Sequence, residues 1–233
     1  MFRQFFDAAS STLTYLLADE ASHEAVLIDP VDTEIATYLA VLKTHHLTLK
    51  YALETHVHAD HITASGQLRQ LLGAKTAVSL QCGAITADLQ LQHQDTIRFG
   101  AQTIQVIATP GHTLGSLCFY VKNQLFTGDT LLINGCGRTD FQGGDAGQLY
   151  DSVTQQIFTL PDETLIYPAH DYNCKRVSNV AQEKNSNARF TQQTRESFIH
   201  MMQHLNLAKP KLIDLAVPAN RMCGVPEAQL PQG

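Results

Sequence analysis

The chain has 233 residues, 44% of them apolar, and its 16 Lys and Arg against 22 Asp and Glu give a formal charge of −6. A chain of this size buries roughly 70–75% of its unfolded surface on folding, and with this composition that excludes intrinsic disorder and collagen-like order. The acidic balance also excludes the basic field that binds nucleic acid regardless of sequence, so an anionic small molecule would need locally placed Arg or Lys.

The N-terminal sequence MFRQFFDAASSTLTYLLADE has the character of neither a signal peptide nor a transit peptide. No apolar stretch approaches the roughly 18 residues that a membrane helix needs. The five cysteines are odd in number and widely spaced, which argues against a disulfide framework and a thiolate zinc site: Cys82, Cys118, Cys136, Cys174 and Cys223. We therefore expect a cytoplasmic protein without a membrane partner.

Apolar runs bounded by turn residues predict strands over residues 12–17, 24–28, 49–54, 76–80, 96–99, 103–108, 116–121, 124–127 and 164–167. Gly100 and Asn123 stand at predicted hairpin turns. Apolar residues at helical spacing predict helices over 33–46, 62–72, 147–158, 176–185 and 191–206, the second of them ending at Gly73. From residue 209 the tail is rich in proline, and we expect it to be irregular.

The order of these elements predicts the fold class. Strands and helices interleave without the strict alternation of a doubly wound sheet, which favours an α/β (mixed α+β) fold with two mixed sheets covered by helices. We expect one domain over residues 1–233, with a short helical and irregular C-terminal segment from about residue 173.

Histidine and aspartate gather in four motifs, each at the end of a predicted strand. The motifs are HVHADH (56–61), TPGHT (109–113), TGD (127–129) and YPAHD (167–171), which together hold five of the eleven histidines. The remaining histidines stand singly, and we interpret them as solvated or capping residues: His23, His45, His46, His93, His200 and His204.

The HVHADH motif has the spacing of a metal site. In an extended segment His56 and His58 project to the same side, so both imidazoles can meet one cation. Asp60 and His61 follow where the chain turns toward the helix and can face a second position. Imidazole with carboxylate suits Zn, Fe or Mn.

These motifs resemble the signature of the metallo-β-lactamase superfamily, over about residues 12–225. The resemblance implies an αββα sandwich with a metal cleft at one edge of its two sheets. Fold alone does not settle the chemistry.

Within the superfamily, the sequence resembles the persulfide (sulfur) dioxygenases of the ethylmalonic encephalopathy protein family in four blocks, at 55–69, 126–146, 157–172 and 209–225. The alternative is hydroxyacylglutathione hydrolase (glyoxalase II), which shares HxHxDH and a GCGR-like segment but generally continues into a longer helical C-terminal region. Here 63 residues follow His170 (233 − 170), which matches the dioxygenase tail better.

The dioxygenase resemblance implies that His56, His112 and Asp129 are the catalytic ligands of one Fe(II) per chain. The implied reaction converts glutathione persulfide, O₂ and water into sulfite and glutathione. The groups implied to surround the iron and to fix ligand tautomers are His58, Asp60, His61 and His170. The same seven residues would also serve a dinuclear zinc thioesterase, so the ligand set alone leaves both chemistries open.

The anionic glutathione moiety would need cations on an acidic protein. We expect Arg138 and Arg221 to bind it and Tyr172 to donate a hydrogen bond. Cys136 is interpreted as a small core hydrophobe, although a persulfide pocket could use a nearby thiol. The resemblance also suggests a homodimer.

Overall fold

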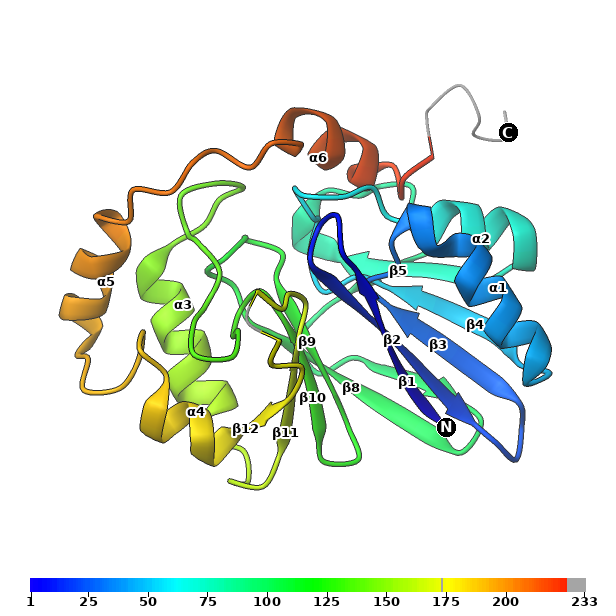
Figure 1. Cartoon of the computed structure of the whole chain (residues 1–233), viewed down its shortest axis with the longest axis horizontal. Helices are drawn as coiled ribbons and strands as arrows, with labels where there is room; N and C mark the ends of the chain where they lie inside the picture. Colours follow the sequence, from blue (N-terminus) through cyan, green and yellow to red (C-terminus); the bar gives the residue numbers. More distant parts are fainter. Residues whose placement is uncertain (173, 226–233) are drawn as a thin grey trace. The chain divides into compact units, whose positions relative to one another are not determined.

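The computed structural model describes residues 1–172 and 174–225 (Figure 1). The chain forms two compact units. The first comprises Met1–Leu91, Ile97–Thr103 and the described residues from Lys209 onward, and the second comprises Gln92–Thr96 and Ile104–Ala208. The expected boundary near residue 173 falls on Asn173, which lies outside the described residues, and a single domain over 1–233 stays a prediction.

The first unit contains a six-stranded sheet in simple sequential order: β1 (Phe2–Asp7), β2 (Thr12–Asp19), β3 (Glu24–Ile28), β4 (Thr48–Leu53), β5 (Lys75–Ser79) and β6 (Leu89–Leu91). β1 to β3 pair antiparallel, whereas β3 to β6 pair parallel. The crossovers between parallel strands carry α1 (Ile35–Thr44) and α2 (Ser65–Leu72), which lie against the sheet in Figure 1. Tyr38 and Leu42 of α1 and Leu68 of α2 are buried in its core.

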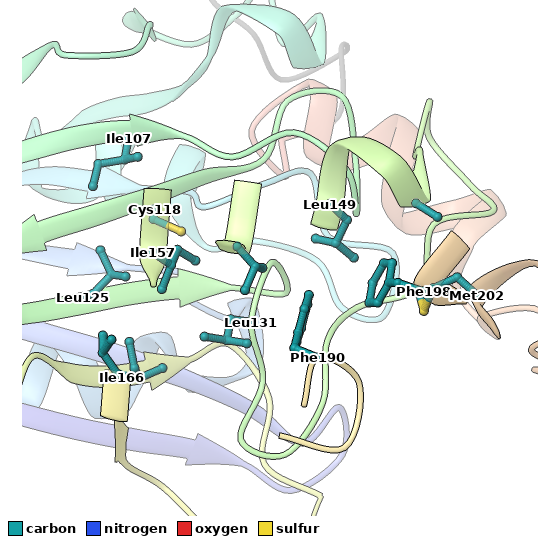
Figure 2. Packing of buried hydrophobic residues seen from close by; sticks show 13 residues of the cluster. Ile107, Cys118, Leu125, Leu131, Leu149, Ile157, Ile166, Phe190, Phe198 and Met202 are labelled. Carbon is teal, nitrogen blue, oxygen red and sulfur yellow. The ribbon is translucent and has the colours of Figure 1, made fainter. Parts of the chain in front are cut away.

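The second sheet has the order β12-β11-β10-β9-β8-β7. Its strands are β7 (Thr96–Phe99), β8 (Gln102–Ala108), β9 (Leu117–Val121), β10 (Gln124–Gly128), β11 (Leu165–Pro168) and β12 (Ser178–Asn179). The helices of the second unit are α3 (Ala146–Ser152), extended by a π-helical turn at Val153–Ile157, α4 (Val180–Ser186) and α5 (Arg195–Gln203). Figure 2 shows the core beneath them, where Leu149, Phe190, Phe198 and Met202 pack together.

The two mixed sheets confirm the predicted fold class, and most of the predicted elements lie within two or three residues of their expected bounds. Two helices, α4 and α5, begin four residues later than predicted. Ser178 and Asn179 form β12 before α4 begins, and Thr194 caps α5 through a reciprocal hydrogen-bond pair with Ser197. β1 was not predicted; its Phe5 ring packs edge-on against Tyr38 at 5.2 Å between centroids.

The prediction of an irregular tail was also wrong. Residues Ile213–Arg221 form a helix, α6, with Pro218 inside it. Its buried residues Ile213, Ala216 and Asn220 lie on one face at helical spacing. Proline keeps a helical φ and forfeits one backbone hydrogen bond, a loss that this packing offsets. No helix among the described residues has the length and apolarity needed to cross a membrane.

Candidate metal centre

The HVHADH motif begins three residues after β4, in an irregular and buried segment of the first unit. His56, His58 and His61 are 2%, 0% and 4% exposed. The ring centroids of His56 and His58 lie 4.0 Å apart, and those of His58 and His61 lie 4.4 Å apart. The loop therefore gathers three imidazoles, whereas the spacing predicted only His56 and His58 together and His61 at a second position.

A buried hydrogen-bond chain sets the tautomer of His56. Asp29 accepts the Thr55 backbone N–H at 2.7 Å and the Thr55 hydroxyl at 2.8 Å. Because the hydroxyl proton goes to Asp29, Thr55 Oγ1 accepts from His56 Nδ1, 3.0 Å away. The lone pair of His56 is consequently on Nε2, the arrangement that a metal ligand requires.

His58 is surrounded by carboxylates of its own unit. Its Nε2 lies 3.2 Å from Asp29 Oδ1 and 3.7 Å from Glu54 Oε2, and its Nδ1 lies 3.9 Å from Asp60 Oδ1. Burial alone would lower the pKa of His58, but Asp29, Asp60 and Glu54 outweigh it and raise that pKa to about 9. Burial also raises the pKa of Glu54, whose Oε1 accepts hydrogen bonds from Thr63 and Ser65.

Asp60 and His61 pair with each other at the end of the motif. Asp60 Oδ2 lies 3.2 Å from His61 Nδ1 and accepts the Thr12 hydroxyl proton at 3.2 Å. The Thr12 hydroxyl oxygen also lies 3.3 Å from His61 Nδ1. The Asp60 side chain is 30% exposed, whereas His61 is buried. The helix that follows begins only at Ser65, three residues later than predicted.

In the second unit, His112 lies in the loop after β8. Its Nδ1 lies 2.6 Å from the Arg138 carbonyl oxygen, which can only accept, so Nδ1 carries the proton and Nε2 the lone pair. Gly111 before it has φ 143°, and a Cβ there would collide with the Leu149 backbone. A Cβ on Gly137 would lie 2.6 Å from His112 Nδ1. The close approach of these loops therefore requires glycine.

Asp129 and His170 follow the parallel strands β10 and β11, whose carboxyl ends meet at one edge of the sheet. His170 Nδ1 donates to Asp129 Oδ1 at 2.6 Å. The other carboxylate oxygen, Oδ2, lies 3.5 Å from His112 Nε2. Since this nitrogen carries a lone pair, two electron-rich atoms face each other, an arrangement that a cation between them would stabilise. The donor set of the second unit therefore fits a divalent metal such as Zn, Fe or Mn.

The predicted ligands are divided between the units. His56 belongs to the first, with His58, Asp60 and His61 around it; His112, Asp129 and His170 belong to the second. That residues of both units bind a single ion stays a prediction.

The three predicted substrate-binding residues have different surroundings. The Arg138 guanidinium donates to both carboxylate oxygens of Asp140, each at 2.6 Å, and to the carbonyls of Leu207 and Ala208 at 3.3 and 2.6 Å. Tyr172 is 66% exposed, and its ring stacks on His170 with centroids 5.7 Å apart. Arg221 ends α6 and is exposed. Arg138 thus already anchors chain segments, whereas Tyr172 and Arg221 reach solvent.

Cys136 is partly buried and packs against the core of the second unit. Its sulfur lies 4.0 Å from Met202 Sδ, and burial raises the pKa of the thiol to about 12. This environment confirms the interpretation of Cys136 as a small hydrophobe. All five cysteines are free.

Sequence reasoning missed three residues that build the first unit's loop: Asp29, Glu54 and Asn220. Asp29 and Glu54 each follow the end of a buried parallel strand, where polar residues often serve a site, and that position was the available signal. Asn220 lies more than 150 residues beyond the loop, and nothing in the sequence alone links the two.

The family model described as "Metallo-beta-lactamase superfamily" matches residues 8–80 and 84–170. The human mitochondrial persulfide dioxygenase ETHE1 is 51% identical over 228 residues, covering 97% of this chain and 89% of the relative. The crystal structure of ETHE1 from Myxococcus xanthus matches with a TM-score of 0.95 at 53% identity, covering 97% of this chain and 100% of that one. A hydroxyacylglutathione hydrolase from Synechococcus sp. is 36% identical over 179 residues, covering 71% of this chain and 66% of the relative.

Asp29→Ala tests the buried network of the first unit. The substitution removes the acceptor of two Thr55 hydrogen bonds and the partner of His58, so we expect a loss of about 3–5 kcal/mol in the free energy of unfolding. Urea denaturation of the metal-free protein, followed by circular dichroism, measures it. The control is Asp214→Ala. The Asp214 carboxylate is 85% exposed beside Lys209, and losing such a surface ion pair lowers the free energy of unfolding by about 0–1 kcal/mol. Equally small losses of unfolding free energy in both variants would show that the Asp29 network does not stabilise the fold.

Proposed function

Because the chain belongs to the metallo-β-lactamase superfamily and, within it, to the persulfide dioxygenases, we propose that its substrate is glutathione persulfide and its metal a single Fe(II). The chain is an oxidoreductase of that family. The observation that carries this assignment is the similarity to ETHE1 over 97% of the chain, which includes the tail after residue 209.

The proposed iron ligands are His56, His112 and Asp129. Their support is chemical: in each unit the imidazole that would bind has its Nδ1 proton directed at an oxygen and its lone pair on Nε2. Two imidazoles and one carboxylate leave positions open, as non-haem Fe(II) oxygenases require. Bound iron would supply a common centre for sulfur and O₂ together with the redox chemistry that triplet O₂ needs.

The proposed reaction is glutathione persulfide + O₂ + H₂O → glutathione + sulfite + 2 H⁺. The outer sulfur gains three oxygen atoms, two from O₂ and one from water, and the S–S bond breaks to release the thiol. Residues around the ligands would orient them and handle the two protons: His170 on Asp129 in the second unit, and His58, Asp60 and His61 in the first.

Dinuclear zinc thioester hydrolysis is the alternative. The similarity to hydroxyacylglutathione hydrolase covers a smaller part of this chain at lower identity than the similarity to ETHE1. The dioxygenase-like tail block at 209–225 also contributes a buried side chain, Asn220, to the HVHADH loop. Both observations favour the dioxygenase.

Glutathione binding would use Arg138, Tyr172 and Arg221. Tyr172 and Arg221 are exposed, and Tyr172 lies directly against the His170 ring. Arg138 would have to bind the substrate while held by Asp140. A cytoplasmic location and a homodimer stay predictions from the sequence and the family resemblance.

Anaerobic purification with metal analysis tests the proposed chemistry. We expect about one iron per chain, O₂ uptake that depends on glutathione persulfide, and no hydrolysis of S-lactoylglutathione. Asp129→Ala should lose both the iron and the O₂ uptake, because Asp129 is the only carboxylate in the proposed ligand set. Two zinc ions per chain with thioester cleavage would instead establish the hydrolase, and an Asp129→Ala variant that keeps iron and turnover would refute the ligand assignment.

Arg138→Ala separates substrate binding from anchoring. If the guanidinium binds a glutathione carboxylate, KM rises about 10-fold to 100-fold with a smaller change in kcat, as expected for a charge-assisted hydrogen bond. Steady-state O₂ uptake measures both constants, and Arg98→Ala, an exposed arginine in the first unit, serves as the control. A lowered melting temperature with an unchanged KM would show that Arg138 only anchors Leu207 and Ala208.

A further inference from the structure

A single buried asparagine of α6 joins the C-terminal segment to the HVHADH loop. The Asn220 side chain is 5% exposed. Its Nδ2 donates to the carbonyl oxygens of His58 and His61 at 3.0 and 2.8 Å, and its Oδ1 accepts the Thr63 N–H at 2.9 Å. Both amide protons and the amide oxygen are therefore used on the backbone of one short loop.

The chain after Asn220 continues along the same loop. The Gly66 N–H donates to the Cys223 carbonyl at 2.8 Å, and a Cβ on Gly66 would lie 2.5 Å from that oxygen. Gly224 has φ 75°, and a Cβ there would collide with the Thr63 carbonyl. Close backbone packing thus holds residues 220–225 against residues 63–66, and it places the Asn220 amide where the loop carbonyls need donors.

The three hydrogen bonds constrain the backbone of the loop between His58 and Thr63. The carbonyls of His58 and His61 flank Asp60, and they are not paired in a strand or helix ladder. Without Asn220 these buried backbone groups would lack hydrogen-bond partners from α6, which is unfavourable, and the loop would have to rearrange. A rearranged loop would move the imidazoles that it carries.

We propose that Asn220 is a positioning residue for the metal site: α6 sets metal affinity by holding the HVHADH backbone through one amide. The inference rests on the proposed metal-dependent function. It concerns how the first unit presents its histidines and is independent of which substrate is oxidised or hydrolysed.

The chemistry of the amide allows two variants that remove different sets of hydrogen bonds. Asn220→Ala removes all three hydrogen bonds. Asn220→Asp keeps the shape and the acceptor for the Thr63 N–H, but it replaces two donors with an oxygen that faces the carbonyls of His58 and His61. If donation from Asn220 positions the loop, Asn220→Asp should lose metal affinity as Asn220→Ala does.

The matched control is Ile213→Ala. Ile213 lies on the same buried face of α6, but it contributes packing and no side-chain hydrogen bond. This variant should therefore weaken the docking of α6 while leaving the Asn220 amide in place.

The test titrates the metal-free full chain with Co(II), using a competing chelator to obtain affinity and the visible absorption to report ligand geometry. We expect both Asn220 variants to bind Co(II) about 10-fold to 100-fold more weakly with an altered spectrum, and Ile213→Ala to bind within about threefold of wild type although its melting temperature falls. Should Asn220→Ala not fold, Asn220→Asp decides the question alone.

Wild-type affinity and spectrum in the Asn220 variants would overturn the proposal, as would an equal loss in Ile213→Ala, which would show that only helix docking matters. Failure of the wild type to bind Co(II) would overturn the metal site itself. Tight Co(II) binding without persulfide-dependent O₂ uptake by the iron-loaded chain would overturn the proposed function and leave the role of Asn220 intact.

Discussion

A neutral imidazole can bind a metal through Nε2 only if its proton is on Nδ1, and an oxygen that accepts from Nδ1 favours this tautomer; both units supply such an oxygen. In the first unit the acceptor for His56 is the Thr55 hydroxyl, whose own proton is taken by Asp29. In the second unit the acceptor for His112 is the Arg138 carbonyl. Each histidine thus finds its acceptor within its own unit: the neighbouring Thr55 hydroxyl for His56, and for His112 a carbonyl of the segment that follows β10.

Burying loops of this kind is unfavourable in free energy unless each polar group inside them has a hydrogen-bond partner. In the first unit Asp29 and Glu54 accept from neighbouring hydroxyl and N–H groups, and Asn220 donates to two loop carbonyls. The C-terminal helix is therefore part of the construction of the site. This gives a physical reason for the resemblance of the tail to persulfide dioxygenases, although the tail holds no predicted metal ligand.

Much of this could be predicted from the sequence, because hydrophobic periodicity marks strands and helices and the HVHADH spacing marks a metal site. The ligand-bearing loops were expected at strand ends, and the structure places them there. Helix α6 was missed because Pro218 obscured a face formed by Ile213, Ala216 and Asn220. Asp29, Glu54 and Asn220 were missed because their roles depend on contacts between segments distant along the chain, which local patterns do not encode.

We propose that one metal ion binds to His56, His112 and Asp129, and that His58 remains with its neighbouring carboxylates. Anomalous diffraction at the iron edge, from crystals of the iron-loaded chain grown without oxygen, measures this most directly. The account predicts one iron site whose protein ligands are the Nε2 atoms of His56 and His112 and a carboxylate oxygen of Asp129. Two metal sites, with His58 bound to one of them, would contradict it.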